Sequence, residues 1–92
     1  MSFWPMSSRH HTVRRAVQEA IYAERDKQDA RWGPLPRGLS DGIWLGVLVE
    51  EVGEVATETI TLQTDHDRLS AELVQVAAVA IAWLEEMGLT DD

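Results

Sequence analysis

The sequence predicts an all-α protein with three main helices. Residues 12–31, 42–62 and 67–87 place apolar residues three and four positions apart, which is the period of an α-helix. Helix-breaking residues separate these segments: a glycine- and proline-rich stretch follows the first, and the turn Thr64-Asp65-His66-Asp67, which we expect to supply helix caps, follows the second. The chain has 92 residues and no cysteine, so we expect one small domain without disulfides or thiolate metal sites. We expect the three helices to form an antiparallel bundle.

The N-terminal region is expected to divide into an arm and a helix. Residues 1–11 contain a proline and the His10-His11 pair without periodicity, so we expect a flexible arm, followed by a single helical domain over residues 12–92. The helix that follows the arm carries small and apolar residues on one face and many arginines and glutamates on the other. Two glycines and two prolines between positions 33 and 38 end it in a loop.

The second predicted helix is amphipathic, with one purely acidic stripe. Ser40 or Asp41 is a natural N-cap for it. On a helical wheel its apolar residues fill one broad arc, and its four glutamates fill another. No lysine or arginine interrupts residues 42–62, although solvated helix faces usually mix both charges. The four glutamates are Glu50, Glu51, Glu54 and Glu58.

The third predicted helix has more apolar surface than the other two helices of one chain can bury. Residues 76–84 are an unbroken apolar run of nine, too short to span a bilayer but apolar on every side of a helix. Gly88 is the expected residue just after the helix. We therefore expect the bundle to be completed by dimerisation, as a homodimer or a homotetramer.

The charge of the chain limits its partners. The formal net charge is −8, so we expect no binding to a nucleic acid polymer. Residues 1–37 hold seven basic and four acidic residues, a balance of +3, whereas residues 38–92 hold one basic and twelve acidic residues, a balance of −11. No membrane partner and no export signal are apparent, so we expect a cytoplasmic protein. The acidic surplus either spreads into water or surrounds cations.

The spacing of the glutamates favours cations. On one helix, Glu50 and Glu51 lie four and three positions before Glu54, so their carboxylates can converge. Glu72 falls in the middle of an apolar stripe of the third helix, where a carboxylate needs an ion pair, a proton or a metal. A solvated acidic face, and an exposed pair between Glu72 and Arg68, remain the alternatives. Ligands that are all oxygen suit Mg²⁺, or Mn²⁺.

These residues resemble the signature of a known family, the MazG-like superfamily of all-α nucleoside triphosphate pyrophosphohydrolases. Its pattern is Glu-Glu-x-x-Glu on one helix and Glu-x-x-Asp on the next. Glu50-Glu51-Val52-Gly53-Glu54 matches the first part in full, and Glu72-Leu73-Val74-Gln75 matches the second except for its last acid. The segment Gln28-Asp29-Ala30-Arg31-Trp32-Gly33 is similar to one found before the acidic helix in some bacterial and phage-type members. More loosely, the resemblance extends over residues 24–85.

The resemblance implies a hydrolase that acts on phosphoric anhydrides and converts a nucleoside triphosphate, with a ribose or deoxyribose sugar, to the monophosphate and pyrophosphate. The biological role that it implies is nucleotide-pool house-cleaning. It implies that Glu50, Glu54 and Glu72 bind the metal, with Glu51 as a further ligand or the group that orients the attacking water. Catalysis is assigned to Glu51 and Glu54. Because Gln75 can ligate a cation but brings no charge, the alternative is a catalytically weakened member that binds nucleotide or metal, or serves as a helical protein-interaction module.

The nucleotide needs further contacts outside the acidic motif. Gln28, Trp32 and Trp44 are the candidates for the base, by hydrogen bonding and stacking, although Trp32 also suits a residue that covers the loop. The candidates for the phosphates are Arg25, Lys27 and Arg31, and the alternative for each is a solvated charge. The wheel positions of Trp44 and Trp83 are more typical of a core or an interface.

Overall fold

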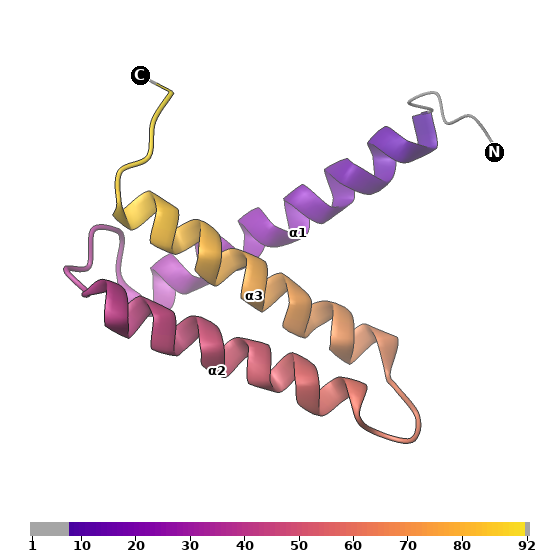
Figure 1. Cartoon of the computed structure of the whole chain (residues 1–92). Coiled ribbons are helices and arrows are strands. Elements are labelled where there is room, and N and C mark those ends of the chain that lie inside the picture. Colours follow the sequence, from indigo (N-terminus) through magenta and orange to yellow (C-terminus); the bar gives the residue numbers. More distant parts are fainter. Residues whose placement is uncertain (1–7, 92) are drawn as a thin grey trace.

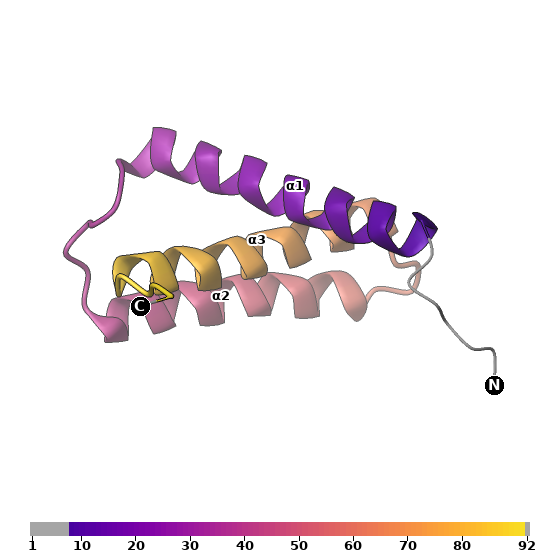
Figure 2. The same cartoon turned by 90° about the horizontal axis from the view of Figure 1, so that it is seen from above.

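The computed structural model describes residues 8–91 and places three helices in them (Figure 1). Helix α1 spans Ser8–Trp32, α2 spans Asp41–Thr59 and α3 spans His66–Glu86. Helices α2 and α3 form an antiparallel hairpin, and α1 packs on α3 but makes no contact with α2 (Figures 1 and 2). The prediction of an all-α bundle of three helices is confirmed for this part of the chain.

The ends of α2 and α3 are fixed by the residues expected there. The Ser40 side chain accepts a hydrogen bond from the backbone N–H of Ile43, and Asp65 accepts from those of Asp67 and Arg68. After α3, Gly88 adopts a φ of 74° and Leu89 donates its N–H to the Leu84 carbonyl oxygen, which is the Schellman arrangement. The predicted caps are therefore confirmed.

Two helix boundaries differ from expectation. Helix α1 begins at Ser8, so His10 and His11 belong to the helix and not to an arm; the rest of the expected arm, residues 1–7, lies outside the described residues. No glycine or proline occurs between Ser8 and Trp32, so nothing interrupts the first turn. Helix α2 ends at Thr59 and not near residue 62. Threonine hydroxyls in this region donate to backbone carbonyls, which competes with a further helical turn.

The core is small and lies between α2 and α3. Trp44, Val79 and Ala82 are buried, and three half-buried side chains surround them: Leu35, Leu48 and Trp83. The apolar run of α3 is only partly covered, since Leu84 remains 46% exposed. The radius of gyration is 15.7 Å, whereas a compact domain of this length would have about 12 Å. One copy of the chain thus leaves much of its apolar surface in water.

Ion pairs fasten the C-terminal half of α1 to α3. Arg25 is 4% exposed and bonds Glu85 at 2.6 Å and 3.2 Å through two of its nitrogens. The next loop is held as well, because Arg37 bonds Asp29 at 3.0 Å and its backbone N–H donates to Glu86. No helix in the described part of the chain is long and apolar enough to cross a membrane.

Candidate metal and substrate site

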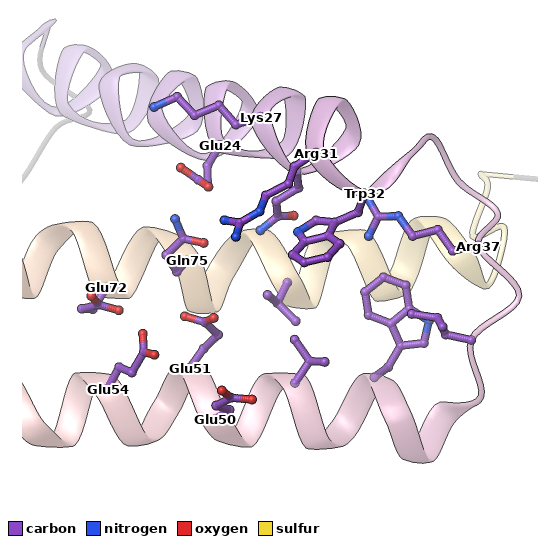
Figure 3. Close-up of a pocket in the computed structure, with 15 residues that line it drawn as sticks. Glu24, Lys27, Arg31, Trp32, Arg37, Glu50, Glu51, Glu54, Glu72 and Gln75 are labelled. Carbon is purple, nitrogen blue, oxygen red and sulfur yellow. The ribbon is translucent and has the colours of Figure 1, made fainter.

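A cavity of about 940 Å³ lies between α1 and α2 and is closed at the back by α3 (Figure 3). This volume is within the range of small-molecule sites. Its walls differ in character: most carboxylates come from α2 and α3, whereas the positive charges come from α1 and the loop after it. The lining residues are Glu24, Lys27, Gln28, Arg31, Trp32, Arg37, Leu39, Trp44, Val47, Glu50, Glu51, Glu54, Glu72, Gln75 and Val79.

Three carboxylates converge at one end of this cavity. Glu51 and Glu54 lie one turn apart on α2, and Glu72 faces them from α3 (Figure 3). One carboxylate oxygen from each of the three lies within 4.8 Å of the other two. Glu50 lines the same cavity, but its carboxylate is not one of the three that converge. Two neighbouring helices therefore bring together three of the four predicted acids.

The electrostatics of the three carboxylates are unfavourable in the absence of a cation. Burial is the largest cause of the raised pKa of Glu51, and the neighbouring charges of Glu54 and Glu72 raise it further. A hydrogen bond with Glu54 is the largest cause of the raised pKa of Glu72, followed by burial. Such a bond between two carboxyl groups requires a proton on one of them. The site thus favours a proton or a cation among its oxygens.

Two oxygens of the cluster are buried without a protein partner. These are Oε2 of Glu51 and Oε2 of Glu72. The described structure contains no ion pair between Arg68 and Glu72, which was the alternative. Arg68 lowers the pKa of Glu72 by less than the hydrogen bond with Glu54 and burial raise it. Buried oxygens without donors, together with an all-oxygen ligand set, fit a hard divalent cation.

Gln75 lies on the cavity wall and not on the outer surface. It is half-buried and, like Glu24 of α1, points into the cavity (Figure 3). Its carbonyl oxygen is therefore placed near the acidic end, as the sequence suggested, but it adds no charge there. Glu24 was not among the predicted residues. Its position four residues before Gln28 would have placed it on the same face of α1.

The opposite wall holds the predicted nucleotide contacts. Gln28, Arg31 and Trp32 all line the cavity, and the Arg31 guanidinium lies 4.8 Å from the centre of the Trp32 ring. Trp32 is 63% exposed, so it does not cover the loop. Trp44 is a core residue, as the wheel indicated, and Trp83 donates to Asp41 at 3.0 Å.

The remaining cations differ in whether they are free to bind phosphate. Lys27 lines the cavity and makes no ion pair in the described structure, whereas the Arg25 guanidinium is bonded to Glu85, Asp29 and Gln28. Arg37 also lines the cavity, although sequence reasoning had not selected it. It lies in a loop, and no periodic pattern could place it there. The expectation that Arg25 reaches phosphates is therefore not supported by its position.

We found no match to the chain among protein-family models, curated proteins or solved structures. Function is consequently argued from the residues that line the cavity.

Proposed function

We propose that the protein is a metal-dependent nucleoside triphosphate pyrophosphohydrolase. The observation that carries this proposal is the convergence of Glu51, Glu54 and Glu72 at one end of a cavity whose facing wall is basic. Carboxylates repel a triphosphate, so a cavity that holds both needs divalent cations between them. The basic wall suits the remaining phosphate charge, and a tryptophan at the far end suits a base.

The side chains that line the cavity would have different roles. Glu51, Glu54 and Glu72 would hold Mg²⁺ or Mn²⁺, with Glu50 and Gln75 at the margin of the same site. When bound, the cation supplies neutralisation of phosphate charge and a lowered pKa for a water molecule. Lys27 and Arg31 would bind the phosphate oxygens, and Trp32 would stack against the base.

The proposed reaction consumes one water. The water oxygen attacks the α-phosphorus, the bond from that phosphorus to the bridging oxygen breaks, and pyrophosphate leaves. Glu51 would hold the cation through one carboxylate oxygen, and its other oxygen would orient this water and take its proton. The proton balance closes when that carboxyl releases the proton to solvent. Reactions of this kind depend on positioning and charge, so no nucleophilic side chain is needed.

We also propose that two copies of the chain associate through α2 and α3. On α2, Leu45, Val49 and Val52 form a stripe opposite the cavity, and each is about half exposed or more. On α3, Leu73 and Leu84 are similarly exposed and also face away from the cavity. Apolar surface of this extent on a small domain is typical of an interface.

A second candidate function is nucleotide or metal binding without turnover. The position of Gln75 on the cavity wall favours it, because an amide replaces a charge where the family pattern has an acid. This candidate predicts binding by calorimetry without release of product.

The test is release of pyrophosphate from a panel of ribo- and deoxyribonucleoside triphosphates with Mg²⁺ or Mn²⁺. We expect turnover of at least one nucleotide and a loss of at least about a hundredfold in Glu54→Ala. The matched control is Glu19→Ala, which removes an exposed acid of α1 outside the cavity. Absence of release above the Glu54→Ala level with every nucleotide would refute the enzymatic function.

A further inference from the structure

Gln28 has its hydrogen-bonding direction fixed by a neighbour. The side chain lines the cavity, and its Oε1 accepts a hydrogen bond of 3.2 Å from Nη1 of Arg25. A guanidinium group only donates hydrogen bonds, so the atom of Gln28 that faces Arg25 must be the amide oxygen. The amide nitrogen is then the part of Gln28 that remains for another partner.

Arg25 cannot turn away to release this arrangement. It is 4% exposed, and it bonds Glu85 at 3.2 Å through Nε and at 2.6 Å through Nη2. Nη2 also lies 3.0 Å from Oδ1 of Asp29. A planar guanidinium held on two edges has little rotational freedom. The amide of Gln28 is therefore bonded to a group that two carboxylates hold in place.

The amide nitrogen of Gln28 has no acceptor among the described residues. Gln28 lies four residues after Glu24 and four before Trp32, about 6 Å along the helix from each. It is thus placed between the acidic end of the cavity and the end where we propose the base. A molecule in the cavity that touches the amide nitrogen of Gln28 therefore meets an N–H donor that has no other partner in the described part of the chain.

We propose that Gln28 binds the substrate by donating a hydrogen bond to an acceptor atom of the nucleotide, and that Arg25 is the residue that positions it. This inference rests on the proposed function for the nature of the ligand. The acceptor is a carbonyl oxygen or ring nitrogen of the base, or a phosphate oxygen, since these share the same chemistry. Bases that present an amino group at this place are disfavoured, because two donors would face each other.

The test measures binding of Mg²⁺ complexes of nucleoside triphosphate analogues in which a methylene group replaces the oxygen between the α- and β-phosphorus. Gln28→Met removes the donor without adding charge, and Gln28→Glu replaces it with an acceptor of the same shape. Both should weaken the best-bound analogue by about tenfold or more in calorimetry. Gln18→Met and Gln18→Glu are the matched controls, because Gln18 is exposed on α1 outside the cavity, and they should bind as the unmodified protein does.

Magnesium tripolyphosphate, which has no base, distinguishes the two sources of the acceptor. If Gln28→Met weakens the analogues but not tripolyphosphate, the acceptor lies on the nucleoside. If both are weakened equally, the acceptor is a phosphate oxygen. Unchanged affinity of Gln28→Met for the analogues would overturn the inference, even if Gln28→Glu binds more weakly, because charge repulsion alone would then explain that loss. Failure of the unmodified protein to bind any analogue would also overturn it.

Arg25→Lys tests the positioning role. Lysine keeps the charge opposite Glu85, but its single nitrogen cannot reproduce the planar set of donors. We expect Gln28→Met to weaken binding less in this background than in the unmodified protein. An equal effect in both backgrounds would show that Arg25 serves the fold alone.

The outcome for Gln28 is separable from the outcome for the activity. Binding of analogues without release of pyrophosphate from true nucleotides would reject the enzymatic function, and the Gln28 variants would still give an answer. Turnover with unchanged binding in Gln28→Met would keep the activity and reject the inference.

Discussion

At the scale of single residues, the carboxylates of the cavity link stability to pH. The pKa of Glu72 is raised above its ordinary value of 4.5, chiefly by its hydrogen bond with Glu54. Between this value and the raised pKa, the folded protein binds more protons than the unfolded chain. The free energy of unfolding that this proton contributes is therefore lost as the pH rises. Metal-free protein should show a free energy of unfolding that falls as the pH rises above about 4.5.

Urea unfolding at a series of pH values measures this effect. Glu72→Gln cannot titrate, so its free energy of unfolding should fall less steeply over the same interval. Saturating Mg²⁺ or Mn²⁺ should also flatten the profile of the unmodified protein, because the cation takes the place of the proton. Parallel profiles for the two proteins would contradict the raised pKa of Glu72.

Gln75 offers a second test at this scale. Gln75→Asp adds a negative charge to the cavity wall beside the three carboxylates. Because cation affinity rises with the charge of the ligand set, Mn²⁺ should bind about tenfold more tightly. Gln18→Asp adds the same charge to an exposed position of α1 and should change little. An unchanged dissociation constant for Gln75→Asp would show that this residue does not face the cation.

Helical periodicity indicated the acids of the cluster but not the whole cavity, and it did not show that Glu50, expected among the metal ligands, lies outside the cluster. Glu51, Glu54 and Glu72 could be selected because their wheel positions depend on each helix alone. Arg37 could not, since it lies in a loop whose path depends on Asp29 and Glu86. Residues of this kind are placed by tertiary contacts, which a single sequence does not display.

At the scale of the elements, the attachment of α1 depends on Arg25. None of residues 9–20 of this helix is buried, so α1 is anchored through its C-terminal half. Arg25→Met should lower the free energy of unfolding by about 2 kcal/mol; this is less than for a fully buried pair, because Glu85 and Asp29 are 46% and 38% exposed.

Equilibrium unfolding in urea, followed by circular dichroism, measures this loss. Arg15→Met is the matched control, since it removes an exposed arginine from the same helix. A similar loss in both variants would mean that the ion pairs contribute little to the attachment of α1.

The interiors of the helices were predicted more accurately than their ends. The apolar period located all three helices, although only α2 and α3 bury apolar side chains among the described residues. The caps at Ser40 and Asp65 were also foreseen, since short polar side chains satisfy free backbone N–H groups. The start of α1 was wrong because a proline upstream suggested an arm, whereas the residues from Ser8 onward contain no helix breaker.

At the scale of the whole molecule, the proposed dimer is the feature that most needs testing. Light scattering after gel filtration should give about twice the chain mass of 10.3 kDa. Val49→Glu should shift the protein toward the monomer, because it places a charge in the apolar stripe of α2. Val13→Glu, on the exposed part of α1, should leave the mass unchanged. A monomeric unmodified protein at micromolar concentration would contradict the proposed interface.

The uneven distribution of charge along the chain corresponds to two different walls of the cavity in the folded molecule. The acidic part supplies one wall of the cavity and the basic part supplies the other, so that positive and negative groups face each other across an open volume. Such an arrangement suits a ligand that carries both phosphates and divalent cations.

Titration of Mn²⁺ into the metal-free protein tests the account most directly, because every functional proposal made above requires a cation among Glu51, Glu54 and Glu72. Electron paramagnetic resonance counts the free ion during the titration. We predict saturable binding that is at least about tenfold weaker in Glu54→Gln and in Glu72→Gln, and unchanged in Glu19→Gln. Absence of saturable binding, or equal binding in all four proteins, would contradict the account.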